Sequence, residues 1–96
     1  MKIVTKVKVK NQMGIHTRPA TTIVKLLQNC KSNVLFTYKR ETVNAKSILS
    51  ILMLAAKKNS SITISCEGVD ADETMKKLVL AFDNEFGETH ANDTLS

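Results

Sequence analysis

The stretch Met13-Gly14-Ile15-His16-Thr17-Arg18-Pro19-Ala20 restricts the folds open to this chain more than any other. Gly14 permits the backbone angles of a tight turn. Pro19 is tolerated in the first turn of a helix, because an N–H group there has no intrahelical acceptor. The chain must therefore change from a strand to a helix between these two residues. This places His16 just before a helix and makes Thr17 the expected N-cap.

His16 would face unpaired backbone N–H groups and the positive end of the helix dipole, where an anion is favoured. An imidazole is partly neutral near pH 7, so it can accept a phosphoryl group and pass it on. Arg18 is permanently charged and can neutralise phosphoryl oxygens. On these residues alone, two interpretations stay open: a phosphoryl acceptor, or a surface histidine without a chemical role.

Four segments have the pattern of β-strands. Residues 2–10 alternate between apolar side chains and lysines, which is typical of a strand with one buried face and one face in water. β-Branched and aromatic residues predict further strands at 34–38, 41–43 and 61–66. The second and third strands are joined through Lys39 and Arg40, which lack the Gly or Asn that a tight hairpin turn prefers.

Three segments are expected to form helices, of which the first and third have a clear apolar stripe. The first helix is expected over about residues 18–29, and the third begins near Asp70 or Asp72 and is ended by Gly87. Ser47 is the expected N-cap of a short second helix. The order of elements predicts an α+β fold, an open-faced β-sandwich (βαββαβα) with a four-stranded antiparallel sheet covered on one face by three helices.

Composition and charge exclude several classes of protein. The 96-residue chain has a net charge of +5, and 12 of its 14 Lys and Arg residues lie in residues 1–58. These basic residues are scattered and no nucleic-acid motif is present, so we expect acidic protein partners and no nucleic acid. No apolar run approaches the roughly 20 residues that span a bilayer, and no signal peptide is recognisable. We therefore expect a cytoplasmic protein without membrane insertion.

Cysteine spacing and the C-terminal sequence complete the outline. Cys30 and Cys66 have no metal-like spacing with each other or with the two histidines, so free thiols and no metal or cofactor are expected. From Glu88 onward the sequence has no periodicity. We expect one domain over residues 1–88 and a flexible C-terminal tail over residues 89–96, which includes His90.

The second helix is apolar nearly all round, and so small a domain cannot bury every one of its side chains. Some of Ile48, Leu49, Ile51, Leu52 and Met53 should be exposed. An exposed apolar patch usually marks a binding surface, whereas the alternative is that these residues fill the core.

Two motifs at a characteristic spacing resemble the HPr family, the histidine-containing phosphocarriers of the bacterial sugar phosphotransferase system. They are Gly14-Ile15-His16-Thr17-Arg18-Pro19-Ala20 and Val43-Asn44-Ala45-Lys46-Ser47-Ile48. A Glu67-Gly68 break before an acidic helix start agrees with the family as well. The resemblance covers about residues 1–88 and implies the same open-faced α+β fold.

The resemblance also implies roles for individual residues. His16 would be phosphorylated on Nδ1 by the phosphoenolpyruvate-dependent Enzyme I and would pass the group to Enzyme IIA domains. Arg18 would steady the phosphoryl group, with the Thr17 backbone and cap beside it. Ser47 falls on the serine that an ATP-dependent HPr kinase/phosphorylase modifies in some branches of the family. The residues predicted to dock partners are Thr21, Ile48, Leu49, Ile51 and Leu52.

The chain departs from the family pattern at several positions. Thr17 stands where Ala is usual, and we predict that Thr17→Ala changes the phosphorylation rate modestly without unfolding the protein. Ser50 and Ala55 replace glycines in and after the second helix, and Arg40 replaces a hairpin glycine. Ser50 and Ala55 should favour the helix but could alter a kinase's fit at Ser47.

Alternative functions remain within the same fold. One is a regulatory HPr-like binding protein that acts through Ser47 and partner docking, although such relatives typically lack the histidine. Another is a carrier in a nitrogen-related phosphorelay, which would use the same histidine chemistry. The chain has one nucleophile and no substrate pocket to argue for, so we expect a stoichiometric, monomeric carrier and not an enzyme.

Overall fold

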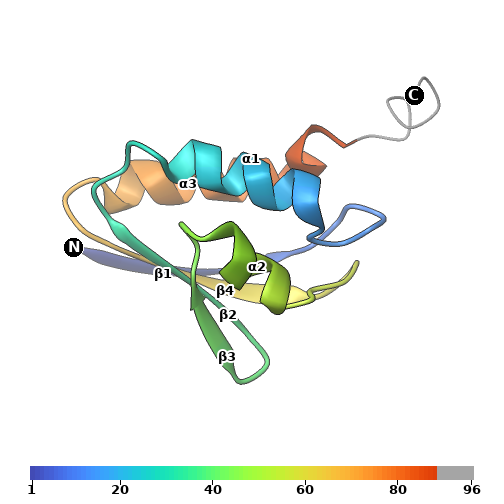
Figure 1. Ribbon diagram of the computed structural model, residues 1–96. Coiled ribbons are helices and arrows are strands. Elements are labelled where there is room, and N and C mark those ends of the chain that lie inside the picture. The colour runs from blue at the N-terminus through green and yellow to red at the C-terminus, as the bar shows by residue number, and fades with distance from the viewer. Residues whose placement is uncertain (89–96) are drawn as a thin grey trace.

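The structure, a computed structural model, describes residues 1–88 and shows a four-stranded sheet with its helices on one face (Figure 1). The predicted tail, residues 89–96 with His90, lies outside the described residues. In chain order the elements are β1 (Lys2–Lys8), α1 (Thr17–Leu27), β2 (Asn33–Tyr38), β3 (Glu41–Asn44), α2 (Ile48–Met53), β4 (Ser61–Glu67), α3 (Ala71–Asp83) and the 3₁₀ helix η1 (Glu85–Gly87).

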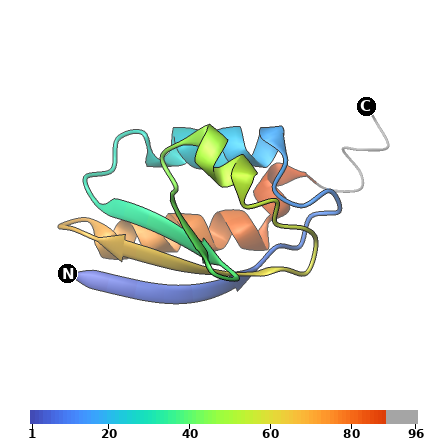
Figure 2. The ribbon, with the colours of Figure 1, turned by 60° about the horizontal axis from the view of Figure 1, so that its bottom comes forward.

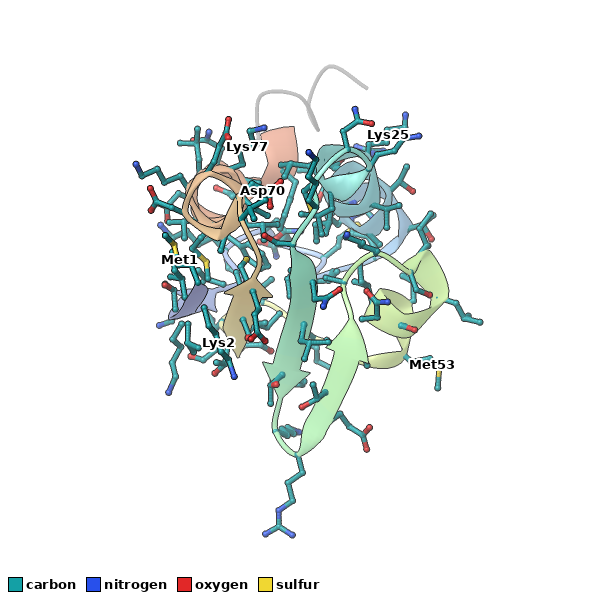
Figure 3. All side chains as sticks on the ribbon, turned by 90° about the vertical axis from the view of Figure 1, so that its left-hand side faces the viewer. Met1, Lys2, Lys25, Met53, Asp70 and Lys77 are labelled. Atoms are coloured by element: carbon teal, nitrogen blue, oxygen red, sulfur yellow. The ribbon has the colours of Figure 1, made fainter. Side chains whose placement is uncertain are left out.

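The sheet has the strand order β1-β4-β2-β3, and every neighbouring pair is antiparallel. In β1 and β4 exposed residues alternate with residues that are buried or half-buried on the side of the helices, as the alternation predicts. Val4 is the exception in β1 and is 56% exposed. Figures 2 and 3 show α1 and α3 side by side over one face of this sheet. The predicted open-faced α+β sandwich is confirmed.

The core lies between the sheet and the apolar stripes of α1 and α3. Phe36 of β2 meets Phe82 of α3 edge to face, with ring centroids 5.8 Å apart, and Phe82 meets Phe86 at 4.8 Å. From α1, Ile23 and Leu27 are completely buried in the same core. Because α1 and α3 run in opposite directions, the start of α1 and the end of α3 lie at the same end of the molecule (Figures 1 and 2).

Element boundaries differ from the sequence prediction at the end of α3. The α-helix stops at Asp83 rather than continuing to Gly87, because Glu85 and Phe86 adopt positive φ angles of 54° and 55°. Phe86 nevertheless stays in the core, as its apolar character requires. At the β2–β3 hairpin, Lys39 takes the left-handed conformation (φ 56°) that a glycine usually supplies.

Two further features of the chain bear on its class. Cys30 and Cys66 are both free, as the sequence predicts, with Cys30 partly buried and Cys66 fully buried. Within residues 1–88, no helix has the length and apolar character needed to cross a membrane.

Candidate functional site

The turn before α1 positions His16 through backbone contacts. Gly14 has φ +69° and donates its N–H to the carbonyl of Asn11 at 3.1 Å. Ile15 is buried and donates its N–H to the carbonyl of Ala56 at 2.9 Å, which ties the turn to the segment after α2. His16 follows in an extended conformation (φ −91°, ψ −166°) as the N-cap of α1. The predicted position of His16 at a helix start is therefore confirmed.

Thr17 is the first residue of α1 and not its N-cap, so that prediction was wrong by one residue. The imidazole of His16 makes no capping hydrogen bond to the helix. The first N–H groups of a helix have no intrahelical acceptor. In α1 these groups belong to Thr17 and Arg18, since Pro19 has no N–H. The helix start therefore presents two backbone donors and the positive end of its dipole beside His16.

The side chain of Glu88 contacts the imidazole of His16. Nε2 of His16 lies 2.8 Å from Oε2 and 3.1 Å from Oε1 of this carboxylate. The Glu88 side chain is only 11% exposed, while that of His16 is 28% exposed. Nη1 of Arg18 lies 3.6 Å from the same Oε2 atom, and the Arg18 side chain is 70% exposed. One carboxylate oxygen is thus shared between an imidazole and a guanidinium group.

The side chain of Asn11 also contacts the Glu88 carboxylate. This side chain is 1% exposed, and Nδ2 donates both to the carbonyl of Gly14 at 2.5 Å and to Oε1 of Glu88 at 3.0 Å. The other polar atom of this amide, Oδ1, is buried and has no hydrogen-bond partner. It is the only such side-chain atom found among residues 1–88.

Neither Glu88 nor Asn11 is predicted from the sequence as a site residue. Glu88 follows the glycine that was expected to end the last helix, and it was assigned to the aperiodic segment. The one feature of the sequence that could have indicated Glu88 is the apolar Phe86 two residues before it, which is buried in the core. For Asn11 the only sign is its place three residues before Gly14, where Asn is a common turn residue.

The second predicted site residue, Ser47, is the N-cap of α2 as expected. Its hydroxyl oxygen accepts a hydrogen bond from the N–H of Ser50 at 3.3 Å. In the same helix Leu49 and Met53 are 70% and 73% exposed, and Met53 projects away from the fold (Figure 3). Ile51, by contrast, is 1% exposed. Ile51 is a core residue, and its predicted place on a docking surface was wrong.

The other predicted docking residues lie at the surface to different extents. Ile48 is 37% exposed, whereas Leu52 is half-buried against the core. A shallow groove between α1 and α2 is lined by Thr21 and Ile48 together with Lys25 and Lys46. Thr21 also donates its hydroxyl proton to the Thr17 carbonyl at 2.8 Å. The apolar surface of α2 therefore continues toward the α1 helix that carries His16.

The arrangement around His16 can hold an anionic group with several oxygen acceptors. It offers an imidazole, an exposed guanidinium group and two helix-terminal N–H groups. In the part of the chain covered by the structure, no three His, Cys, Asp or Glu side chains gather in a way that could hold a metal ion.

Comparisons with known proteins show which family this chain resembles. Residues 3–84 match the family model described as "PTS HPr component phosphorylation site". The phosphocarrier protein HPr of Chlamydia muridarum is 48% identical over 80 residues, which cover 83% of this chain and 77% of that protein.

Solved structures resemble the fold as well. The crystal structure of HPr from Thermoanaerobacter tengcongensis has a TM-score of 0.87 at 32% identity, covering 91% of this chain and 98% of that one. Crh of Bacillus subtilis, described as a catabolite repression protein that forms a dimer with a swapped domain, has a TM-score of 0.70 at 31% identity. That comparison covers 84% of this chain and 93% of Crh.

Proposed function

This chain belongs to the HPr family of phosphocarrier proteins, and on that premise we propose that His16 carries the phosphoryl group between Enzyme I and Enzyme IIA domains in sugar uptake. One observation carries the proposal: a carboxylate oxygen of Glu88 is held between His16 and Arg18. A phosphoryl group is also an anion with oxygen acceptors, so the same side chains can stabilise it.

The proposed step uses the neutral imidazole as a nucleophile. The lone pair of Nδ1 attacks phosphorus, a new N–P bond forms, and the bond from phosphorus to the donor breaks. Arg18 is exposed enough to turn from Glu88 to the phosphoryl oxygens. The N–H groups of Thr17 and Arg18 supply further hydrogen bonds at the helix start. Transfer to an Enzyme IIA domain reverses these steps, so the protein acts stoichiometrically and its partners supply the catalysis.

Mass spectrometry can test the carrier function directly. The pure protein is incubated with phosphoenolpyruvate and an Enzyme I, preferably from the same source, beside a His16→Ala variant. We expect one added, acid-labile phosphoryl group on the wild type and none on the variant. The proposal fails if the folded wild type stays unmodified while a known carrier is labelled in the same reaction. That result would favour a regulatory protein acting through Ser47.

We further propose that partners dock on the exposed apolar face of α2. Leu49 and Met53 are the most exposed large side chains of this helix, and Ile48 connects them to the groove beside α1. Lys25 and Lys46 at that groove suit an acidic rim on a partner. In a Leu49→Ala variant, phosphoryl transfer at subsaturating Enzyme I should slow while the fold stays intact.

Phosphorylation of Ser47 is proposed as a way to control this docking. A phosphate there would lie at the start of α2, where negative charge is stabilising, so the fold should persist. It would also place about two negative charges next to the apolar face that partners contact. We expect Ser47→Asp to accept phosphate from Enzyme I more slowly than the wild type. An unchanged rate in a folded Ser47→Asp variant would contradict this regulatory role.

We propose that the carrier works as a monomer. β1 is an edge strand, and its outward residues Lys2, Lys6 and Lys8 are all exposed. Charged residues on an edge strand oppose pairing with the same edge of a second copy. Sedimentation equilibrium across a range of concentrations should give the mass of one chain; a dimer mass at micromolar concentration would contradict the proposal.

A further inference from the structure

The two nitrogens of His16 have different surroundings. Nε2 is within hydrogen-bond distance of both oxygens of Glu88. Among residues 1–88, no hydrogen-bond partner is found for Nδ1. A carboxylate can only accept a hydrogen bond, so this contact requires the proton on Nε2. The neutral ring then carries its free lone pair on Nδ1.

Building on the proposed carrier function, we infer that Glu88 is a positioning residue for His16. It holds the proton on Nε2 and thereby leaves Nδ1 as the nucleophile. It also fixes the plane of the ring, because both carboxylate oxygens approach the same nitrogen at 2.8 and 3.1 Å.

Glu88 has a second consequence during transfer. When the Nδ1 lone pair forms the N–P bond, the ring still bears its Nε2 proton and becomes positively charged. The bonding electrons between phosphorus and the donor leave with the donor, and no proton has to move. The adjacent carboxylate stabilises the charged ring, as a buried aspartate stabilises an imidazolium in a catalytic triad.

Asn11 keeps the carboxylate in place. Its Nδ2 donates to Oε1 of Glu88, so the carboxylate is oriented by the amide on one side and the imidazole on the other. For its own buried Oδ1, no hydrogen-bond partner is found among residues 1–88. An unsatisfied buried polar atom is unfavourable, and such exceptions to normal packing occur mostly at functional sites. This points to Asn11 serving the site rather than the core.

The backbone of Glu88 is anchored independently of these side chains. Its N–H donates to the carbonyl of Glu85 at 2.9 Å, which closes the 3₁₀ turn. Two residues before it, Phe86 is buried against Phe82. The carboxylate therefore extends from a fixed point at the end of α3, opposite the N-cap of α1, and is not a loosely attached side chain.

The test compares Glu88→Ala, Glu88→Gln and a matched control, Glu85→Ala. The control removes a carboxylate three residues away in the same turn, for which no side-chain contact to His16 occurs among residues 1–88. Uniformly ¹⁵N-labelled proteins are studied by NMR for the proton on Nε2 of His16, identified by its absence in His16→Ala. Phosphoryl transfer from phosphorylated Enzyme I is timed in parallel.

In the wild type we expect a slowly exchanging Nε2 proton, which a structural role for Glu88 would not require. Glu88→Ala should lose this signal and accept the phosphoryl group about tenfold more slowly, the low end of what a charge-assisted hydrogen bond contributes. Glu88→Gln keeps an acceptor oxygen without the charge, so its rate of phosphoryl transfer should lie between those of the wild type and Glu88→Ala. Glu85→Ala should match the wild type in both measurements.

Each other outcome overturns the inference. A folded Glu88→Ala variant that keeps the Nε2 signal, or transfers within twofold of the wild type, removes the positioning role while the carrier function stands. If phosphoryl transfer slowed equally in Glu85→Ala, the effect would come from the loss of any negative charge near the site and not from the contact between Glu88 and His16. If the wild type accepts no phosphoryl group at all, the proposed function fails and this inference fails with it.

Discussion

Nε2 of His16 lies 2.8 Å from Oε2 of Glu88, although the two residues are 72 positions apart in the sequence. His16 is the N-cap of the first helix, and Glu88 closes the turn after the last one. The site is therefore assembled from the start of the first helix and the residue after the last one. Its geometry depends on the antiparallel packing of α1 and α3, which places those two ends together.

The two sides of α2 should respond differently to truncation. Ile51→Ala removes a buried side chain and should lower the free energy of unfolding by about 2–5 kcal/mol. Leu49→Ala removes an exposed one and should change it by no more than about 0.5 kcal/mol. Urea unfolding followed by circular dichroism measures both. Equal losses in the two variants would contradict the assignment of Ile51 to the core and Leu49 to the surface.

Gly14 should resist substitution more strongly than Gly87. Both have positive φ, +69° and +81°, so alanine at either position carries left-handed strain of roughly 1–2 kcal/mol. At Gly14 the new Cβ would also meet the carbonyl oxygen of Ala56 and lie 2.9 Å from Cα of Lys57, whereas at Gly87 no atom of residues 1–88 outside its chain neighbours lies within 4 Å of the new Cβ. Gly14→Ala should therefore lower the urea midpoint further than Gly87→Ala does, and equal midpoints would show that the turn adjusts freely.

Ionisation of Asp70 should make the free energy of unfolding depend on pH in the acidic range. Hydrogen bonds from the Lys31 N–H (2.8 Å) and the Ser32 hydroxyl (2.5 Å) hold the pKa of its carboxyl below the usual value of 3.8. When the pKa of a carboxyl is lower in the folded state than in the unfolded state, ionisation of that carboxyl stabilises the fold at any pH above the unfolded-state pKa. This stabilisation is lost as the pH falls through the folded-state pKa. Asp70→Asn should be less stable than the wild type at pH 7, and this difference should shrink below about pH 4.

Unfolding titrations at pH 7 and below pH 4 measure that difference. Asp72→Asn is a suitable control, because Asp72 lies at the same helix start and makes only an exposed ion pair with Lys76 at 3.3 Å. Such pairs contribute little to stability. A difference between the wild type and Asp70→Asn that is the same at both pH values would contradict the prediction.

The two thiols should differ in reactivity. Burial raises the pKa of the Cys66 thiol to about 11 from its usual 9.0. At pH 8 its thiolate fraction should be about 100-fold below that of an ordinary thiol, and the side chain is also inaccessible. Iodoacetamide should label Cys30 in the native protein and Cys66 only after denaturation, as peptide mass spectrometry can show. Native labelling of Cys66 at the rate of Cys30 would contradict this.

Much of the fold could be predicted from local patterns. Alternation in 2–10 and 61–66 and the apolar stripes of the first and last helices report directly on which faces are buried, because burial follows the period of the backbone. The site histidine could be predicted as well, since Gly14 and Pro19 restrict the backbone on either side of it. Ser47 as an N-cap is a similarly local property, confirmed by its hydrogen bond to Ser50.

Other features were decided by packing between distant segments. The apolar sequence of α2 could not say that Ile51 faces inward and Leu49 outward, because nearly every position on that helix is apolar. The residues around Gly14 and Pro19 did not place the N-cap at His16 rather than Thr17, a difference of one residue. In the fold, the N–H of Ile15 just before it bonds to the carbonyl of Ala56, a residue far away in the sequence.

The sequence by itself determined the place of His16 before the first helix, its arginine neighbour and the order of strands and helices, because these follow from patterns within a few residues. Only the tertiary structure decided that Glu88 and Asn11 join the site. Their places depend on how α1 and α3 lie across the sheet, and the buried Phe86 lies two residues before Glu88, whose side chain contacts His16. A contact across 72 residues comes from the closure of the whole fold, and no local pattern of residue types encodes it.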